Sequence, residues 1–478
     1  MTKLHLAFVA LASTLIAGCS PAHGQPALKL EACTVPRVSE PLMCGRLPVP
    51  EDRTRAGGRT ISLNVVVVPA TGTKTGPPFY DIAGGPGLAA TDAADFWAGH
   101  PLRASRDIVL VDQRGTGRSV PLPCELEFSN PFEPLLDPQA VNACRERLSR
   151  DHDLARFSTA AAVADLDAVR AALGHERVDL SGLSYGTRVA QEYLRHHPDR
   201  VRAMVLLGAV HPGDKLPLNY SRNAEAVLDT LVRQCAADSA CHSVIPDLGS
   251  DLAKLRRALD AGPVNVELPE GRTASLEAGP FWEAVRRQLT TTSGQRRLPW
   301  LLHEAAAGRF APVLTVMAPP GGPDGFSNGM LLSVVCPEDT LRITDAELAA
   351  AGTASFGTHR LRAQIAACQA WGVAPLLDDP RPGLVRSDVP VLLMAGEVDH
   401  VTPASAAMDI ASALPNGRVI RIPHLGHVPD EGISNLDCYD RLITEFLERG
   451  SARDLDAKCV ETMSPAPFEL DPEQAPVR

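Results

Sequence analysis

The apolar positions of this 478-residue chain fall into two patterns that alternate over much of its length. Short, mainly apolar runs rich in β-branched residues are typical of strands buried in a parallel sheet. These runs lie at residues 60–69, 79–83, 108–111, 178–180, 201–207, 389–395 and 418–422. Segments with helical periodicity follow or separate them, at residues 138–148, 160–173, 187–197, 403–414 and 435–449. The alternation predicts an α/β fold with a mostly parallel, doubly wound sheet, whose ligand sites lie at the strand C-termini.

The alternation stops near Pro212 and returns near Ser387. Between them the pattern is mainly helical, with helices expected at residues 224–236, 252–259, 282–289, 300–307 and 346–371 and a loop at 318–329. We therefore predict a sheet core formed by residues 51–211 and 388–478, with residues 212–387 inserted as a helical cap domain. Residues 25–51 are rich in proline, and we predict a loop-like entry segment there.

The N-terminus has the pattern of a targeting signal. Lys3 precedes an apolar run at residues 4–17 that is too short to span a bilayer comfortably. The run ends in Ile16-Ala17-Gly18-Cys19, which resembles a bacterial lipobox. This resemblance implies that residues 1–18 are a lipoprotein signal peptide, that Cys19 carries the lipid, and that residues 19–50 form a tether and entry segment. The alternative is ordinary signal cleavage nearby, with Cys19 removed. We expect an exported protein anchored to the cell envelope, at the outer membrane or in the periplasm of a Gram-negative cell.

The net charge of the chain limits the classes of partner that it can bind. A net charge of −11 argues against nucleic acid, and contact with a membrane is expected only through the lipid anchor. The sequence indicates no oligomeric state.

Apart from Cys19 there are ten cysteines, an even number that permits five disulfides in an oxidising compartment. Loop length favours pairing neighbours, although sequence does not fix connectivity: Cys33 with Cys44, Cys124 with Cys144, Cys235 with Cys241, Cys336 with Cys368 and Cys438 with Cys459. No C-x-x-C or H-E-x-x-H motif is present, so we expect no metal site.

The segment Gly182-Leu183-Ser184-Tyr185-Gly186 fits the G-x-S-x-G pattern. It follows an apolar strand and precedes a helix, where a tight turn would expose the serine hydroxyl. Ser184 is therefore the candidate nucleophile. The pentapeptide alone is a weak signal, because many serines at such positions only cap a helix.

A nucleophilic serine needs a histidine as base and a carboxylate that orients the histidine. Asp399 and His427 each follow a predicted strand and complete the chain order serine, acid, histidine. His424 and Glu397 lie close by in the sequence and are the reserve candidates, and His400 is a further alternative for the base.

The reaction also needs two backbone N–H donors for the oxyanion. The N–H of Tyr185 is one candidate, and Gly85 in the loop Gly84-Gly85-Pro86-Gly87 is the other. A phosphate-binding loop is the rival interpretation, but no G-K-[ST] sequence follows, and Gly115-Thr116-Gly117 lacks the third glycine of a dinucleotide fingerprint. We therefore expect no cofactor.

Five motifs together resemble the proline iminopeptidase and tripeptidyl aminopeptidase branch of the α/β-hydrolases. They are GGPG at 84–87, DQRGTGRS at 112–119, GLSYGT at 182–187, GEVDHVTP at 396–403 and GH at 426–427; Cys438 also resembles the C-terminal segment of the tripeptidyl enzymes. The resemblance implies an α/β-hydrolase fold with a cap and release of N-terminal residues or short peptides through an acyl-enzyme. It also implies that Glu338 and Asp339, in the segment Val335 to Asp339, bind the substrate's α-ammonium group.

The sequence departs from this branch at two places. Residues 208–212 (GAVHP) begin with glycine where relatives often have aspartate, and residues 81–83 (DIA) replace a common His-Gly run before the oxyanion loop. The second departure weakens a strict assignment as a proline iminopeptidase. Two other functions remain open: an esterase or amidase acting on small non-peptide substrates, and a lipid-anchored binding protein that has lost catalysis.

Overall fold

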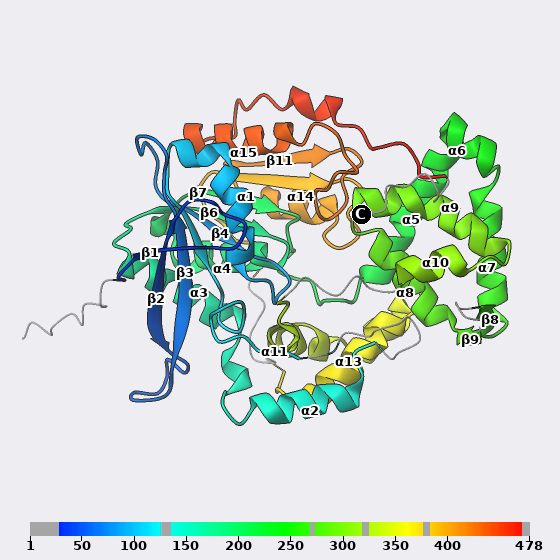
Figure 1. The fold of residues 1–478 in the computed structure, drawn as a ribbon, viewed down its shortest axis with the longest axis horizontal. Helices are drawn as coiled ribbons and strands as arrows, with labels where there is room; N and C mark the ends of the chain where they lie inside the picture. The colour runs from blue at the N-terminus through cyan, green and yellow to red at the C-terminus, as the bar shows by residue number, and fades with distance from the viewer. Residues whose placement is uncertain are drawn as a thin grey trace, which may run out of the picture.

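The computed structural model describes residues 28–124, 126, 135–267, 273–317, 325–375 and 383–470. Cys19, the predicted signal peptide and most of the predicted loop at 318–329 lie outside these residues. Figure 1 shows a sheet with its covering helices beside a separate group of helices.

In the described residues nine strands form one sheet, in the order β1-β2-β3-β5-β4-β6-β7-β10-β11. Strands β5, β4, β6, β7, β10 and β11 run parallel to one another. The pairs β1 with β2, β2 with β3 and β3 with β5 are antiparallel. The strands are β1 (Glu31–Cys33), β2 (Leu42–Pro50), β3 (Thr60–Val68), β4 (Phe79–Ile82), β5 (Ile108–Val111), β6 (Val178–Leu183), β7 (Val201–Leu207), β10 (Val391–Gly396) and β11 (Gly417–Ile422). The predicted mostly parallel, doubly wound sheet is confirmed.

Helices cover both faces of this sheet because its strands bury both sets of alternate side chains. Val391 and Leu393 of β10 belong to one buried cluster, which includes residues of α2 (Pro138–Leu148), α3 (Thr159–Ala172), α4 (Tyr185–His196) and α14 (Ala404–Ser412). Leu392 and Met394 belong to the other cluster, with residues of α1 (Ala94–Gly99) and α15 (Asp437–Arg449).

The prediction of a loop for residues 25–51 is wrong, because β1 and β2 lie there. In β2 the buried residues Leu42, Leu47 and Val49 face the core, while Pro48 and Pro50 are exposed. Strand β1 pairs only with residues 42–44, so both prolines lie where β2 is the edge of the sheet. Proline is tolerated at such an edge because its missing N–H has no neighbour to bond.

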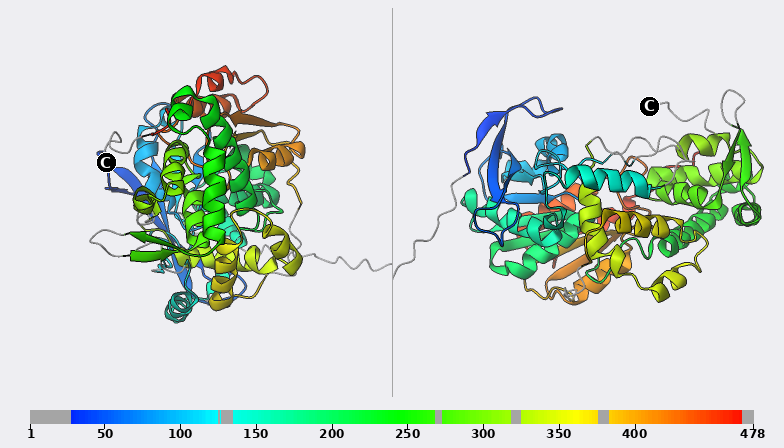
Figure 2. Two further views of the ribbon diagram at one scale, coloured as in Figure 1. Left: turned by 90° about the vertical axis from the view of Figure 1, so that its right-hand side faces the viewer. Right: turned by 90° about the horizontal axis from the view of Figure 1, so that it is seen from below.

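The inserted segment divides between two packing environments. Helices α5 to α10 pack around a core of their own, with bounds α5 (Tyr220–Ala237), α6 (Ser239–Val244), α7 (Leu248–Asp260), α8 (Ala278–Gln288), α9 (Thr292–Ala306) and α10 (Ala311–Met317). By contrast α11 (Asn328–Glu338) and α13 (His359–Trp371) contribute buried residues to the cluster of the sheet. Seen from below, the sheet lies at one end of the molecule and α5 to α10 at the other (Figure 2). We use "cap" for residues 212–387 as a whole.

Two details of the cap differ from the sequence prediction. A two-stranded hairpin, β8 (Val264–Glu267) and β9 (Thr273–Leu276), lies where only helices were expected. The single helix predicted for 346–371 is two helices, α12 (Asp345–Ala351) and α13. The break falls at Gly352 and Gly357, and Gly357 has a φ of 64° that favours glycine.

All five disulfides expected from loop length are present, with Cα–Cα distances of 5.1 to 5.8 Å. Cys336–Cys368 joins α11 to α13, and Cys438–Cys459 joins α15 to the segment that follows it. Neighbouring cysteines therefore pair throughout the described chain.

Candidate active site

Ser184 occupies a sharp turn between β6 and α4. Its backbone has φ 54° and ψ −122°, a conformation that non-glycine residues rarely adopt and that is typical of a nucleophile elbow. A Cβ atom at Gly182 would lie 2.4 Å from the Gly186 carbonyl oxygen, and one at Gly186 would lie 2.1 Å from the Ile82 carbonyl oxygen. Both glycines are thus required by close backbone packing, which lets the turn hold the serine in this strained position.

Ser184, His427 and Asp399 come together at the C-terminal ends of the parallel strands β6, β11 and β10. The His427 Nε2 atom lies 2.9 Å from Ser184 Oγ, and its Nδ1 atom lies 2.9 Å from Asp399 Oδ2. Asp399 follows β10 and His427 follows β11, so the sheet brings residues 28 positions apart into contact. This chain of hydrogen bonds is the arrangement that lets a histidine accept the serine proton.

Asp399 is held as a carboxylate by several donors. The backbone N–H groups of Val401 and Thr402 donate to its Oδ1 atom at 2.7 and 2.9 Å, and the Thr402 hydroxyl donates to Oδ2 at 2.6 Å. Burial alone would raise the pKa of Asp399, but the His427 ring and the Thr402 bonds hold it below its ordinary value. The acid is therefore ionised wherever the histidine has to act as a base.

Thr402 contacts both the candidate acid and the candidate base, and it is not among the site residues predicted from the sequence. Its hydroxyl lies 3.0 Å from His427 Nδ1 as well as touching Asp399, and the whole residue is buried. Gly208 leaves room for this contact, since a Cβ there would lie 2.9 Å from Thr402 Oγ1 and 3.4 Å from the His427 ring. A signal existed in the sequence, because Thr402 lies three residues after Asp399 in the GEVDHVTP motif.

The reserve candidates point elsewhere. His400 is fully buried, accepts a hydrogen bond from Arg286 at 3.1 Å, and has a pKa lowered to about 3 by burial and by that guanidinium. His424 lies 3.4 Å from the Gln234 amide, and Glu397 forms an ion pair with Arg421 at 2.7 Å. Of the histidines in the described chain, His427 is the one that bonds Ser184.

The two predicted oxyanion donors flank the serine. A Cβ at Gly84 would lie 3.1 Å from Ser184 Cβ, so the glycine loop runs directly against the nucleophile. The Gln113 amide donates to the Ala83 carbonyl at 3.0 Å and fixes the start of this loop. Within the described residues neither the Gly85 nor the Tyr185 backbone N–H has a hydrogen-bond acceptor. Both groups are therefore open to bind a developing negative charge.

Glu338 and Asp339 lie at the C-terminal end of α11; Asp339 is fully buried, and the Glu338 side chain is 11% exposed. Arg188 binds Asp339 through two hydrogen bonds of 2.8 and 3.3 Å and lies 3.8 Å from Glu338. Glu338 accepts bonds from the Thr159 N–H and hydroxyl at 2.8 and 2.6 Å, and burial raises its pKa. Sequence gave no signal for these partners, because Arg188 and Asp339 lie 151 residues apart.

Thr159 connects Glu338 to the elbow. Its hydroxyl lies 3.0 Å from the Tyr185 phenol oxygen, and Tyr185 directly follows Ser184. The predicted amine-binding carboxylates are therefore close to the base of α4 rather than on a distant part of the cap.

The cap also holds the loop that carries His427. The His427 backbone N–H donates to the Thr290 carbonyl at 2.8 Å, and the Thr292 hydroxyl donates to the His424 carbonyl at 3.0 Å. Thr292 also accepts from the Gly426 N–H at 3.2 Å. The histidine is positioned by the link between α8 and α9 as much as by the sheet.

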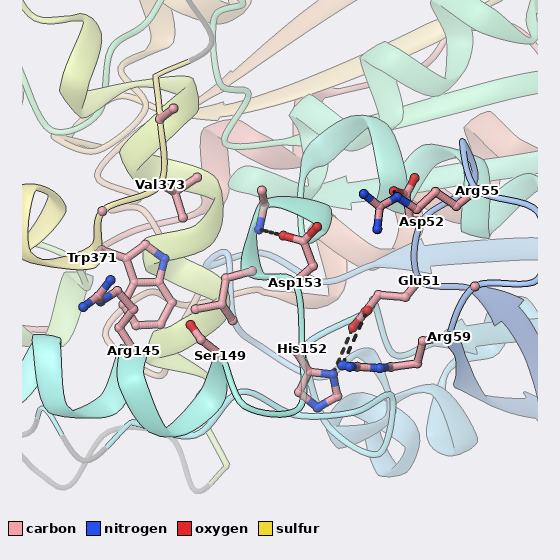
Figure 3. A pocket seen from close by; sticks show the side chains of 15 residues that line it. Glu51, Asp52, Arg55, Arg59, Arg145, Ser149, His152, Asp153, Trp371 and Val373 are labelled. Atoms are coloured by element: carbon pink, nitrogen blue, oxygen red, sulfur yellow. Dashed lines mark hydrogen bonds and ion pairs between the residues drawn. The ribbon is translucent and has the colours of Figure 1, made fainter.

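One pocket of about 630 Å³ lies away from these residues, between the turn that joins β2 to β3 and the ends of α2 and α13 (Figure 3). Several of its charged groups are paired with one another: Glu51 lies 3.0 Å from His152 and 3.7 Å from Arg59. No predicted site residue lines it.

In the described part of the chain, no helix is long and apolar enough to cross a membrane.

Residues 77–429, more than half of the chain, match the family model described as the alpha/beta hydrolase fold. Serine protease Hip1 of Mycobacterium tuberculosis is 26% identical over 478 residues, covering 87% of each chain. Tripeptidyl aminopeptidase of Streptomyces lividans is 24% identical over 472 residues, covering 90% of this chain and 85% of that protein. Carboxylesterase B of M. tuberculosis is 28% identical over 411 residues, covering 78% of each.

Proposed function

This chain belongs to the α/β-hydrolase family, and we propose that it releases N-terminal residues or short peptides from peptide substrates through an acyl-enzyme on Ser184. The chain is a serine hydrolase. The observation that carries the mechanism is the position of His427, 2.9 Å from both Ser184 Oγ and Asp399 Oδ2.

In the proposed reaction His427 takes the Ser184 proton as the hydroxyl attacks the scissile carbonyl carbon. The tetrahedral oxyanion binds the backbone N–H groups of Gly85 and Tyr185. His427, now a cation stabilised by Asp399, protonates the leaving amine, and the acyl-enzyme forms. A water molecule then gives a proton to His427 as it attacks the ester carbonyl. His427 returns that proton to Ser184 Oγ as the carboxylic product leaves, which restores the enzyme. Removing one oxyanion donor typically lowers the rate by about 100-fold or more.

The aminopeptidase specificity is supported by the relative named tripeptidyl aminopeptidase and by the two buried carboxylates near the elbow. We propose that Glu338 and Asp339 recognise the substrate's α-ammonium group, since a desolvated cation needs a paired anion. Arg188 engages Asp339 through two hydrogen bonds but Glu338 only at 3.8 Å. Glu338 in turn accepts two hydrogen bonds from Thr159, and a carboxylate has lone pairs left to accept further bonds from a ligand.

An esterase or amidase acting on small non-peptide substrates is the second candidate, and the relative named carboxylesterase B supports it. A panel of free-amine peptide amides, N-blocked peptide amides and simple esters separates the two. Turnover of free-amine peptides is expected, and turnover of esters alone would refute the peptidase function. Labelling by a fluorophosphonate, lost in Ser184→Ala, tests the nucleophile. Absence of labelling in the folded protein would favour a binding protein without catalysis.

We also propose that the protein is exported and lipid-anchored through Cys19. The five disulfides support export, because such bonds persist in oxidising compartments. Metabolic labelling with a palmitate analogue should mark the wild type and not Cys19→Ser. Label retained by the variant, or absent from both, would refute the anchor.

A further inference from the structure

Two helices of the cap bring three arginines together. Arg286 and Arg287 are on α8, Arg360 is on α13, and the two helices pack against each other. At the start of the contact the His359 ring fills the space that a side chain at Gly279 would need, since a Cβ there would lie 2.5 Å from His359 Nδ1. The three guanidinium groups are close enough for Arg360 and Arg286 each to lower the pKa of Arg287. We call Arg286, Arg287 and Arg360 the arginine cluster.

The cluster lies next to the catalytic loop. Arg286 donates to His400 Nε2 at 3.1 Å, and His400 directly follows Asp399 in the chain. The same guanidinium lies over the Tyr220 ring, 5.4 Å from its centroid. These contacts place the cluster on the side of the cap that faces the triad residue Asp399.

Glu283 neutralises one of the three charges. It binds Arg286 through two hydrogen bonds of 2.7 and 2.8 Å, and both side chains are buried. Burial would raise the pKa of Glu283, but Arg286 lowers it to about 2. Glu283 directs both of these bonds to Arg286, and in the described residues it makes no direct hydrogen bond or ion pair with Arg360.

Arg360 forms no hydrogen bond or ion pair with any residue in the described part of the chain, and its Nε atom is buried. Burial lowers the pKa of Arg360; the charge of Glu283 opposes this shift, and the neighbouring Arg286 adds to it. A partly desolvated guanidinium beside a like charge is costly unless an anion binds it. The planar guanidinium fork matches a carboxylate, which it can bind through two parallel hydrogen bonds.

We propose that Arg360, supported by Arg286, binds a carboxylate of the peptide substrate, either its C-terminus or an acidic side chain. The proposal rests on the peptidase function proposed above and adds a second charged anchor to the amine site. An enzyme with both anchors selects short peptides with a free amine and a suitably placed carboxylate.

The test uses full-length Ser184→Ala protein, which binds substrate without turnover, and isothermal titration calorimetry. One pair of ligands is tetra-alanine as its free acid and as its C-terminal amide. A second pair is Ala-Ala-Glu-Ala amide and Ala-Ala-Gln-Ala amide. In one pair the carboxylate form should bind at least about 10-fold more tightly, the scale of a hydrogen bond to a charged group. The pair that shows the preference identifies the source of the carboxylate.

Adding Arg360→Met removes the charge and keeps the apolar stem, and it should abolish the preference. Arg362→Met is the matched control, because Arg362 is exposed on the same helix; it should leave the preference intact. Succinate should compete with the carboxylate ligand and not with its neutral partner, a measurement that does not depend on the folding of Arg360→Met.

Equal binding within both pairs, or a preference that survives Arg360→Met, would overturn the proposal. Failure of the peptidase function gives a different result: wild-type enzyme would then turn over none of the four peptides, including the neutral ones. If wild-type enzyme turns over the peptides but the Ser184→Ala protein binds the neutral and acidic forms equally, the peptidase function stands and the carboxylate site is refuted.

Discussion

Replacing Thr402 with valine tests whether the triad depends on a fourth side chain. Valine has nearly the same shape as threonine, so packing against Gly208 is kept while the hydroxyl is lost. The change removes the 2.6 Å donor to Asp399 Oδ2 and the 3.0 Å contact with His427 Nδ1. Asp399 keeps the two backbone donors to its other oxygen. The expected result is an active site that is intact but less well oriented.

The magnitude follows from the type of bond. A hydrogen bond to a charged group contributes about 1.5–3 kcal/mol. Because each 1.36 kcal/mol corresponds to a tenfold change in rate, kcat should fall by about 10- to 100-fold. KM should change little, since Thr402 is buried behind the triad and does not reach the substrate.

Steady-state kinetics on the best substrate of the panel measures both constants, and Thr402→Ser is the control that restores the hydroxyl. Serine should recover most of kcat, and thermal unfolding should be similar in both variants. Full activity of Thr402→Val would show that the hydroxyl is dispensable. An equal loss in Thr402→Ser would show that the methyl group, and hence packing, matters instead.

Three further predictions address the base, the amine site and the cap. His427→Ala should abolish turnover in steady-state assays while His424→Ala retains it, and the reverse result would move the base to His424. Glu338→Gln and Asp339→Asn should raise KM for free-amine peptides and spare N-blocked ones; equal effects on both would contradict amine recognition. The pKa of Glu283 is lowered to about 2, so its stabilising effect is present above the unfolded value of about 4.5 and is lost as pH falls toward 2. In urea unfolding, the free energy of unfolding of the wild type should fall by about 3 kcal/mol between about pH 4.5 and 2 through this group, and Glu283→Gln should remove that part of the decrease. An unchanged pH profile in the variant would refute the role of the ion pair.

The sheet and the order of the three site residues could be predicted because both depend on local patterns. Each parallel strand is a short apolar run, and Asp399 and His427 follow such runs directly, at one edge of the sheet. Strand β2 was missed because Pro48 and Pro50 dominate its composition, although its buried positions alternate. In a sequence, proline favours the prediction of a loop because it cannot donate a hydrogen bond inside a sheet. At the edge of a sheet that donor is not needed, so proline is tolerated there.

Contacts between distant segments explain most of what the sequence could not indicate. The bond between Arg188 and Asp339 joins α4 to the end of α11, and no local pattern identifies either partner. The ion pair of Glu283 and Arg286 has the three-residue spacing of a helix face, but the spacing does not reveal that Arg286 also reaches His400. Charged residues in the cap look like solvated surface in the sequence and become buried only through the packing of α8 on α13.

These contacts connect the cap to the loops that carry the candidate base and acid. His427 must keep its ring between Ser184 and Asp399, yet its backbone N–H is bound by Thr290, a cap residue between α8 and α9. The same helix α8 carries Arg286, which bonds His400 beside Asp399. A displacement of α8 would therefore move groups attached to the loops of both the base and the acid. Because a small misplacement of catalytic groups can lower a rate by about 100-fold, cap residues far from the scissile bond should influence kcat as well as KM.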